Sequence, residues 1–116
     1  MSDNVIEQEW GYELVWSKTD SYQGRILFFN KPSKTNMHMH KDSTKSWFVN
    51  DGEFRVKWID TSSGQLYENI LKEGAVFHVG KFMPVSAECI SNQGSILEVS
   101  DRQDNDELSI IPSKNF

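Results

Sequence analysis

The sequence predicts an all-β domain built as a jelly roll or a small barrel. Apolar residues alternate with polar ones in short runs, turn-forming residues separate the runs, and the sequence shows no helical face of useful length. The clearest run is EFRVKWID, in which Phe54, Val56 and Trp58 alternate with Arg55 and Lys57. Many short strands spaced by turns are typical of sandwiches, jelly rolls and barrels.

Nine strands are expected along the chain, each a short run rich in β-branched, aromatic or alternating apolar residues. In order, they cover residues 12–16, 25–29, 35–40, 45–49, 53–60, 67–71, 75–79, 84–89 and 95–99. Gly, Pro, Asn and Asp between the runs tolerate turn backbone, and Asp51-Gly52 predicts a hairpin. A short helical turn is expected only near residues 101–106.

Length and composition indicate one globular domain over residues 1–116. A chain of 116 residues can bury one hydrophobic core without disulfides or a structural metal. Its content of 37% apolar and 12% aromatic residues is too high for a disordered chain. Barrels of this size fill their interior with side chains. The aromatic residues expected mostly in the core are Trp10, Trp16, Trp47, Trp58, Phe28, Phe54 and Phe77.

Charge and cysteine content limit the classes of partner and the cellular compartment that we expect. The formal net charge is −5, and no lysine or arginine stripe could neutralise a phosphate backbone, so nucleic acid is not expected as a partner. The single cysteine, Cys89, rules out an internal disulfide and suits a reducing compartment. The N-terminus shows no leader pattern and no run of eighteen apolar residues occurs, so we expect a cytoplasmic protein without a membrane partner.

Two histidines one residue apart, in NMHMH, are the first candidate site. On a strand, residues two apart share a face, so His38 and His40 can point together while Met37 and Met39 point the other way. We expect the strands at 35–40 and 45–49 to form a hairpin-like pair with both histidines facing the barrel interior. The alternative is a polar pair on a solvated face with the methionines in the core. His78 is expected to be a structural or rim residue.

The ordered motifs of the chain resemble a small single-domain cupin. More narrowly, they are similar to cupins of the mannose-6-phosphate-isomerase type, including small members encoded by viruses. The likeness covers about residues 9–112 and implies a double-stranded jelly-roll (cupin) β-barrel and a homodimer. It rests on Trp10-Gly11 with Glu13, Tyr22, Gly24, Arg25, Leu27, the His-x-His pair, Gly52, Trp58-Ile59-Asp60-Thr61, Gly74 and Glu98-Val99-Ser100.

The resemblance also implies where a metal site would lie. In the family, two histidines and a glutamate of one motif and a histidine of a second surround a divalent ion; the histidines here are His38 and His40, but the other two positions hold Lys45 and Val85. A nearby ammonium costs a dication about 4 kcal/mol at 4 Å with an effective dielectric near 20. We therefore expect no resident cofactor and only weak metal binding by the two histidines. Residues that could complete the set are Asp42, His78, Glu88, Met37 and Met39.

The preferred functional hypothesis is a degenerate cupin that binds a small polar or anionic ligand, such as a sugar or sugar phosphate, without catalysis. The ligand-binding residues would be His38, His40, Lys45, Arg25 and Trp47. The alternatives are a metal-dependent carbohydrate isomerase, epimerase or lyase, and an interaction protein without a ligand. Lys45 itself could instead be a solvated residue at the start of a strand, or a nucleophilic amine.

Overall fold

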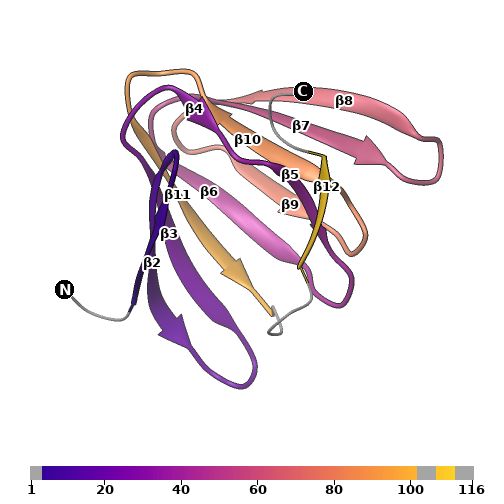
Figure 1. Ribbon diagram of the computed structural model, residues 1–116, viewed down its shortest axis with the longest axis horizontal. Coiled ribbons are helices and arrows are strands. Elements are labelled where there is room, and N and C mark those ends of the chain that lie inside the picture. The colour runs from indigo at the N-terminus through magenta and orange to yellow at the C-terminus, as the bar shows by residue number, and fades with distance from the viewer. Residues whose placement is uncertain (1–3, 102–106, 112–116) are drawn as a thin grey trace.

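The computed structural model describes residues 4–101 and, as backbone, residues 107–111 (Figure 1). These residues form twelve strands: β1 (Val5–Gln8), β2 (Gly11–Lys18), β3 (Gln23–Phe29), β4 (Ser33–Lys34), β5 (Met37–His40), β6 (Lys45–Asp51), β7 (Phe54–Asp60), β8 (Gln65–Leu71), β9 (Val76–Val79), β10 (Val85–Cys89), β11 (Gly94–Ser100) and β12 (Glu107–Ile111). Within these ranges, no helix has the length and apolar character needed to cross a bilayer.

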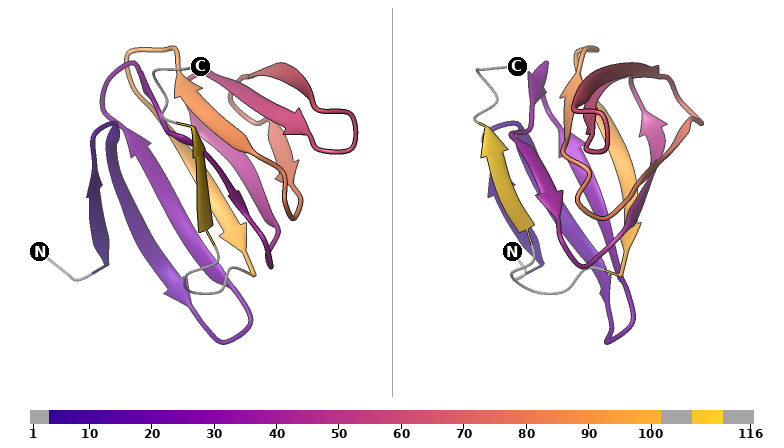
Figure 2. Two further views of the ribbon diagram at one scale, coloured as in Figure 1. Left: turned by 45° about the vertical axis from the view of Figure 1, so that its right-hand side comes forward. Right: turned by 90° about the vertical axis from the view of Figure 1, so that its right-hand side faces the viewer.

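The strands form two antiparallel sheets that face each other, as Figure 2 shows from the side. The first sheet has the order β1-β2-β3-β11-β6-β9, and the second has the order β12-β5-β10-β7-β8, with β4 paired to β10. Strands that follow one another in sequence often lie in different sheets, as in a jelly roll. The all-β jelly-roll prediction is confirmed.

All nine expected strands are present, and the run expected at 35–40 corresponds to β5, over residues 37–40. β1, β4 and β12 were not expected. β1 has the sequence VIEQ and is mostly exposed, so it carries no alternation to detect, and its partner β2 follows after only two residues. Of the helical turn expected near 101–106, residues 102–106 lie outside the described residues.

Two local pairing expectations are wrong. The runs 35–40 and 45–49 do not pair as a hairpin, because β5 belongs to the second sheet and β6 to the first. The Asp51-Gly52 turn likewise joins strands of different sheets. Gly52 has φ +85°, and a Cβ there would lie 2.6 Å from the carbonyl oxygen of Gln93. The dipeptide therefore marks a corner between sheets, because turn chemistry fixes the local bend and not the partner of the next strand.

The space between the sheets has an apolar end and a polar end. Along β6 the inward side chains go from charged to apolar, in the order Lys45, Trp47 and Val49. The strand register aligns the polar positions, since Glu98 lies opposite both Arg25 and Trp47. The apolar end is the main core, formed by Trp10, Leu27, Phe29, Trp47, Val49, Phe54, Val56, Leu71, Val79, Val85, Ala87, Cys89 and Ile96.

The aromatic residues expected in the core divide between the inside and the outside. Five of them are in the core or packed against it, as expected: Trp10, Trp47, Phe54, Trp58 and Phe77. The expectation was wrong for Trp16, which is 55% exposed, and Phe28 is only half-buried, stacked on Tyr12. The Trp16 ring covers Gly24, where an added Cβ would lie 2.4 Å from the indole.

The reactivity of the Cys89 thiol tests the packing of the apolar end. Its side chain is fully buried, and burial raises the pKa of the thiol, so at pH 8 the group is both shielded and protonated. We expect its reaction with a chromogenic disulfide reagent to be at least about tenfold slower in native protein than in denaturant. Stoichiometric reaction of native protein at the rate of free cysteine would contradict this packing.

Candidate functional site

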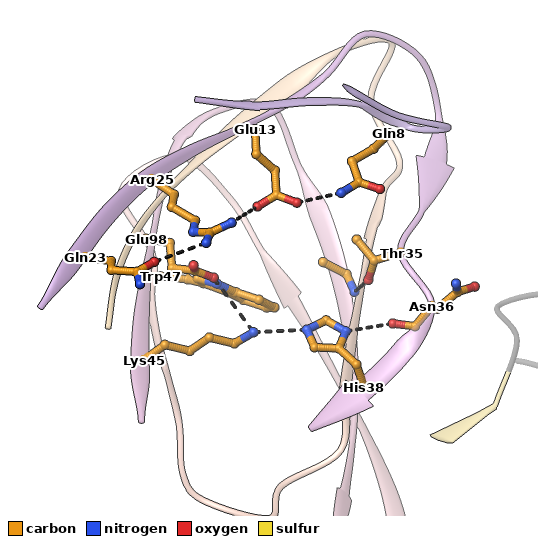
Figure 3. A network of polar contacts seen from close by, with 11 residues as sticks. Gln8, Glu13, Gln23, Arg25, Thr35, Asn36, His38, Lys45, Trp47 and Glu98 are labelled. Carbon is orange, nitrogen blue, oxygen red and sulfur yellow. Dashed lines mark hydrogen bonds and ion pairs between the residues drawn. The ribbon is translucent and has the colours of Figure 1, made fainter. Parts of the chain in front are cut away.

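A cavity of about 120 Å³ lies at the polar end, between the two sheets. It has room for about four water molecules, since each occupies about 30 Å³ in the liquid. Strands of both sheets contribute to its wall (Figure 3). The lining residues are Gln8, Trp10, Glu13, Leu27, Thr35, Asn36, His38, Lys45, Trp47 and Glu98.

Lys45 is at the centre of this wall. It begins β6 and is only 6% exposed, so the alternative of a solvated lysine is wrong. Its Nζ lies 3.0 Å from Nε2 of His38 and 3.7 Å from Oε1 of Glu98. The same ammonium lies 5.0 Å from the centroid of the Trp47 ring, a cation–π distance. Figure 3 shows the side chain extending across the cavity toward His38.

The contacts of His38 fix its tautomer. Nδ1 lies 2.8 Å from the carbonyl oxygen of Asn36, which can only accept, so Nδ1 carries the hydrogen. Nε2 faces the ammonium of Lys45 at 3.0 Å, so it accepts. His38 is therefore a neutral imidazole whose only basic nitrogen is already used by Lys45.

Glu98 supplies the buried negative charge. Its side chain is 4% exposed, and Oε1 accepts a 2.8 Å hydrogen bond from Nε1 of Trp47 besides facing Lys45. A buried carboxylate needs such partners, because desolvation costs several kcal/mol per ion when it is not compensated. Trp47 is thereby held by its indole nitrogen and by stacking on Phe77, at 6.2 Å between ring centroids.

A second pair of charges extends the network toward β1. Glu13 accepts a 2.6 Å bond from Arg25 and a 2.7 Å bond from the amide of Gln8. Gln23 accepts a 3.1 Å bond from the other terminal nitrogen of Arg25. Glu13 faces the cavity, whereas Arg25 lies behind it and is not part of the lining. Each cation of the network thus faces a carboxylate, and the four charges sum to zero.

Of the five predicted ligand-binding residues, the structure brings three together at the cavity. His38, Lys45 and Trp47 line it. His40 is 3% exposed, with its ring centroid 5.7 Å from that of His38. The imidazole pair therefore faces the interior, and the alternative of a solvated histidine face is wrong. His40 and Arg25 are not among the lining residues.

The two positions that the family resemblance marks as changed both lie beside His38. Lys45 contacts its Nε2, and Val85 lies directly opposite it in the β5–β10 ladder. Opposed residues of an antiparallel pair share a face, with Cβ atoms about 4.5–5.5 Å apart. Val85 is fully buried in the core cluster, so a methyl surface occupies the position of the expected histidine.

These residues do not fit a cupin metal centre. A catalytic divalent ion needs about three protein ligands, and the Lys45 ammonium already binds the nitrogen that His38 would offer. Among the described residues, no group of three or more His, Cys, Asp or Glu could hold a metal ion. The Glu98 carboxylate is close, but it serves Lys45 and Trp47 instead.

The residues considered as replacement ligands lie elsewhere. His78 binds the hydroxyl of Ser46 at 2.7 Å on the outer face of the first sheet, the structural role expected of it. Glu88 accepts a 3.0 Å bond from Arg55 on the outer face of the second sheet. Asp42 is exposed in the turn after β5. The methionines of β5 alternate with the histidines and so point the other way.

Sequence reasoning missed the partners of Lys45. Glu98 was noted only as part of a motif, and Glu13 likewise, so neither was predicted to carry a role in the site. A signal was present in SILEVS: Glu98 shares a face with Ile96 and Ser100, while the other face holds Leu97 and Val99. A charged residue on the inward face of an apolar strand predicts a buried partner of opposite charge. Other cavity residues missed are Gln8, Thr35 and Asn36.

Solved structures with the same fold are numerous but distant in sequence. The capsular polysaccharide assembling protein CapF from Staphylococcus aureus is 11% identical with a TM-score of 0.82, over 92% of this chain and 32% of that chain. A single-residue variant of the oxalate decarboxylase of B. subtilis is 16% identical with a TM-score of 0.81, over 91% and 30%. A recombinant oxalate oxidase in complex with glycolate is 15% identical with a TM-score of 0.69, over 77% and 46%.

The chain therefore spans about a third of the length of CapF and oxalate decarboxylase. No family model matches the sequence. No curated protein matches it either. At these identities the likeness shows the fold, which is the double-stranded jelly roll of cupin proteins.

The Lys45–Glu98 pair can be tested by stability. Lys45→Met should lower the free energy of unfolding by about 3–5 kcal/mol, because it leaves the Glu98 carboxylate buried without its cation. The double variant Lys45→Met with Glu98→Gln should recover most of the loss, since the glutamine oxygen still accepts from Trp47. Denaturant unfolding of the wild type, of Lys45→Met and Glu98→Gln alone, and of the double variant measures the coupling. Additive losses in the double variant would contradict the pairing.

A metal titration tests whether positions 45 and 85 are the vacated ligand sites. Protein without a histidine tag should carry less than one equivalent of Zn, Fe, Mn or Ni. Lys45→Glu with Val85→His should bind a divalent metal at least about 100-fold more tightly than either single variant, because ligands of one ion are coupled. Calorimetry measures this, with circular dichroism as the folding control. Stoichiometric metal in the wild type, or no gain in a folded double variant, would contradict it.

Proposed function

We propose that this protein is a metal-independent cupin that binds a small neutral polyhydroxy molecule, such as a monosaccharide or polyol, in the cavity between its sheets. The observation that carries the proposal is the contact of Lys45 with both His38 and Glu98. In cupins of the resembled type a metal cation is held beside this histidine; here the ammonium of Lys45 lies beside His38, and Glu98 balances its charge.

Charge balance favours a neutral ligand over an anion. An anion would have to compete with Glu98 for Lys45 and with Glu13 for Arg25, and both carboxylates are held within the fold. A neutral polyol needs no such exchange, because hydroxyl groups both donate and accept. The charged groups and the amides of Gln8 and Asn36 offer it fixed partners.

The rest of the cavity wall also suits a sugar. Trp10 and Trp47 contribute indole surface to the lining, and rings of this kind present an apolar face to the C–H groups of a sugar. The small volume of about 120 Å³ limits the buried part of a ligand to roughly one ring. A drug-sized ligand generally needs about 300 Å³ or more.

Two further likenesses support a carbohydrate. The motif order resembles mannose-6-phosphate-isomerase-type cupins, and the structurally similar CapF is a capsular polysaccharide assembling protein. A metal-dependent isomerase, epimerase or lyase finds less support, because the residues do not fit the metal on which such chemistry would depend. The protein is proposed to bind its ligand without transforming it.

Calorimetric titration with matched pairs of compounds tests the proposal. A neutral monosaccharide should bind at least about tenfold more tightly than its phosphate ester, because the phosphate meets two carboxylates. Lys45→Met with Glu98→Gln should weaken sugar binding at least about tenfold. Lys72→Met, at an exposed lysine outside the cavity, is the control and should leave it unchanged. Tighter binding of the phosphate, or no binding of any neutral sugar or polyol at millimolar concentration, would overturn the proposal.

A further inference from the structure

A second hollow lies outside the barrel, on the outer face of the first sheet. Its volume is about 520 Å³, within the range of about 300–1,000 Å³ that is usual for small-molecule sites. Leu27 and Phe29 belong to the core, so Phe28 between them points outward. This hollow is called the outer groove, and its lining includes Tyr12, Phe28, Asp51, Glu73 and Ser95.

The strand register explains why the sheet is hollow at this place. Tyr12 of β2 lies opposite Phe28 of β3. Phe28 in turn lies opposite Ser95 of β11, which lies opposite Asp51 of β6. Neighbouring strands are about 4.8 Å apart, so the row runs from two aromatic rings across one small side chain to a carboxylate. In the next row the same strand β11 presents Leu97, so it is the small Ser95 that leaves a gap beside the Phe28 ring.

The aromatic side of the gap is a stacked pair. The ring centroids of Tyr12 and Phe28 are 4.7 Å apart, with 23° between the ring planes. Both side chains are only half-buried, so the pair keeps exposed ring surface. A flat ring placed over Ser95 would extend this stack by one member, because aromatic rings pair with their centroids about 4.5–7 Å apart. This side of the groove therefore suits an apolar ring.

The opposite side of the gap carries two carboxylates. Asp51 ends β6, and Glu73 lies in the turn between β8 and β9. Oε2 of Glu73 accepts a 3.4 Å bond from the backbone nitrogen of Gly52, which brings this carboxylate close to Asp51. Both side chains are exposed, and within the described part of the chain no lysine or arginine lines the groove or forms an ion pair with either one. Lys31 and Lys72, the sequence neighbours of lining residues, are exposed and lie outside the lining.

We propose that the outer groove binds a small organic cation in which a flat ring carries an ammonium group on a short chain. The ring fills the gap over Ser95 against Phe28, and the ammonium lies against Asp51 and Glu73. Charge complementarity selects this occupant, because two carboxylates without a cation in the lining attract a positive group and repel an anion. The net charge of −5 on the whole chain adds to this attraction at longer range.

The outer groove is separate from the inner cavity. The cavity lies between the sheets, the groove lies on the outside of the first sheet, and the two share no lining residue among those that the structure describes. Binding of a cation in the groove therefore does not depend on binding of a sugar in the cavity.

The test compares three compounds that share an indole ring and a two-carbon chain but differ in charge. At about pH 7 tryptamine is a cation, tryptophol is neutral and indole-3-propionate is an anion. Tryptamine should bind at least about tenfold more tightly than tryptophol, and indole-3-propionate should bind most weakly. Titration followed by the backbone amide signals in NMR measures the three affinities, and the signals of Ser95 and Asp51 should be among those that shift.

Three variants and a matched control test the contacts. Asp51→Asn and Glu73→Gln should each weaken tryptamine binding at least about threefold, because each removes one carboxylate with little change of shape. Ser95→Leu should abolish binding, because it fills the gap in the row. Asp20→Asn is the control: it removes the same charge in the exposed turn between β2 and β3 and should leave the affinity unchanged.

Circular dichroism confirms that each variant is folded, and the two amide variants decide the matter if Ser95→Leu does not fold. Indole-3-propionate binding as tightly as tryptamine would overturn the proposal, as would an absence of tryptamine binding at about 10 mM. A loss of affinity as large in Asp20→Asn as in Asp51→Asn would also overturn it. So would NMR shifts confined to Thr35 and His38, since they would place the ligand in the inner cavity.

Discussion

The contact of the Lys45 ammonium with His38 and Glu98 is the interaction on which the polar end of this barrel depends. A lysine that is 6% exposed is stable only with a counter-charge, and Glu98 provides it from the neighbouring strand. The same carboxylate oxygen holds the indole of Trp47, and the same ammonium fixes the tautomer of His38. One buried ion pair thus orients two further cavity residues and occupies the region where the family resemblance implies a metal ion.

The sequence predicted the fold because its signal is local and repeated. Period-two runs and turn residues identify nine of the twelve strands, and the ordered motifs led to the jelly roll. Strand partners were less predictable. Asp51-Gly52 has the chemistry of a hairpin, yet β6 and β7 lie in different sheets, because partner choice is decided by burial across the whole domain. β1 was not predicted because its sequence, VIEQ, shows no alternation of apolar and polar residues, and it is held in the sheet by pairing with β2.

The candidate site was predictable in its positions and not in its charge balance. Strand parity placed His38 and His40 on one face, and the family resemblance favoured the inward orientation of both and of Lys45, which is where the structure has them. The expectation of an anion site treated Lys45 as an uncompensated charge, because its partner Glu98 is 53 residues away in sequence and becomes a neighbour only through the β6–β11 ladder. On β11 the charged Glu98 is buried and the apolar Val99 beside it is exposed. This arrangement supplies the buried carboxylate and leaves apolar surface on the outside of the sheet.

The central claim is that Lys45 donates to a neutral His38 in place of a metal ion. The most direct measurement is the nitrogen NMR spectrum of the His38 ring near pH 7.5, assigned with a His38→Gln variant. The account predicts a neutral ring with its hydrogen on Nδ1, an Nε2 signal that changes in Lys45→Met, and no change when zinc is added at one equivalent. A hydrogen on Nε2, an imidazolium, or a shift of the Nε2 signal on adding zinc would contradict it.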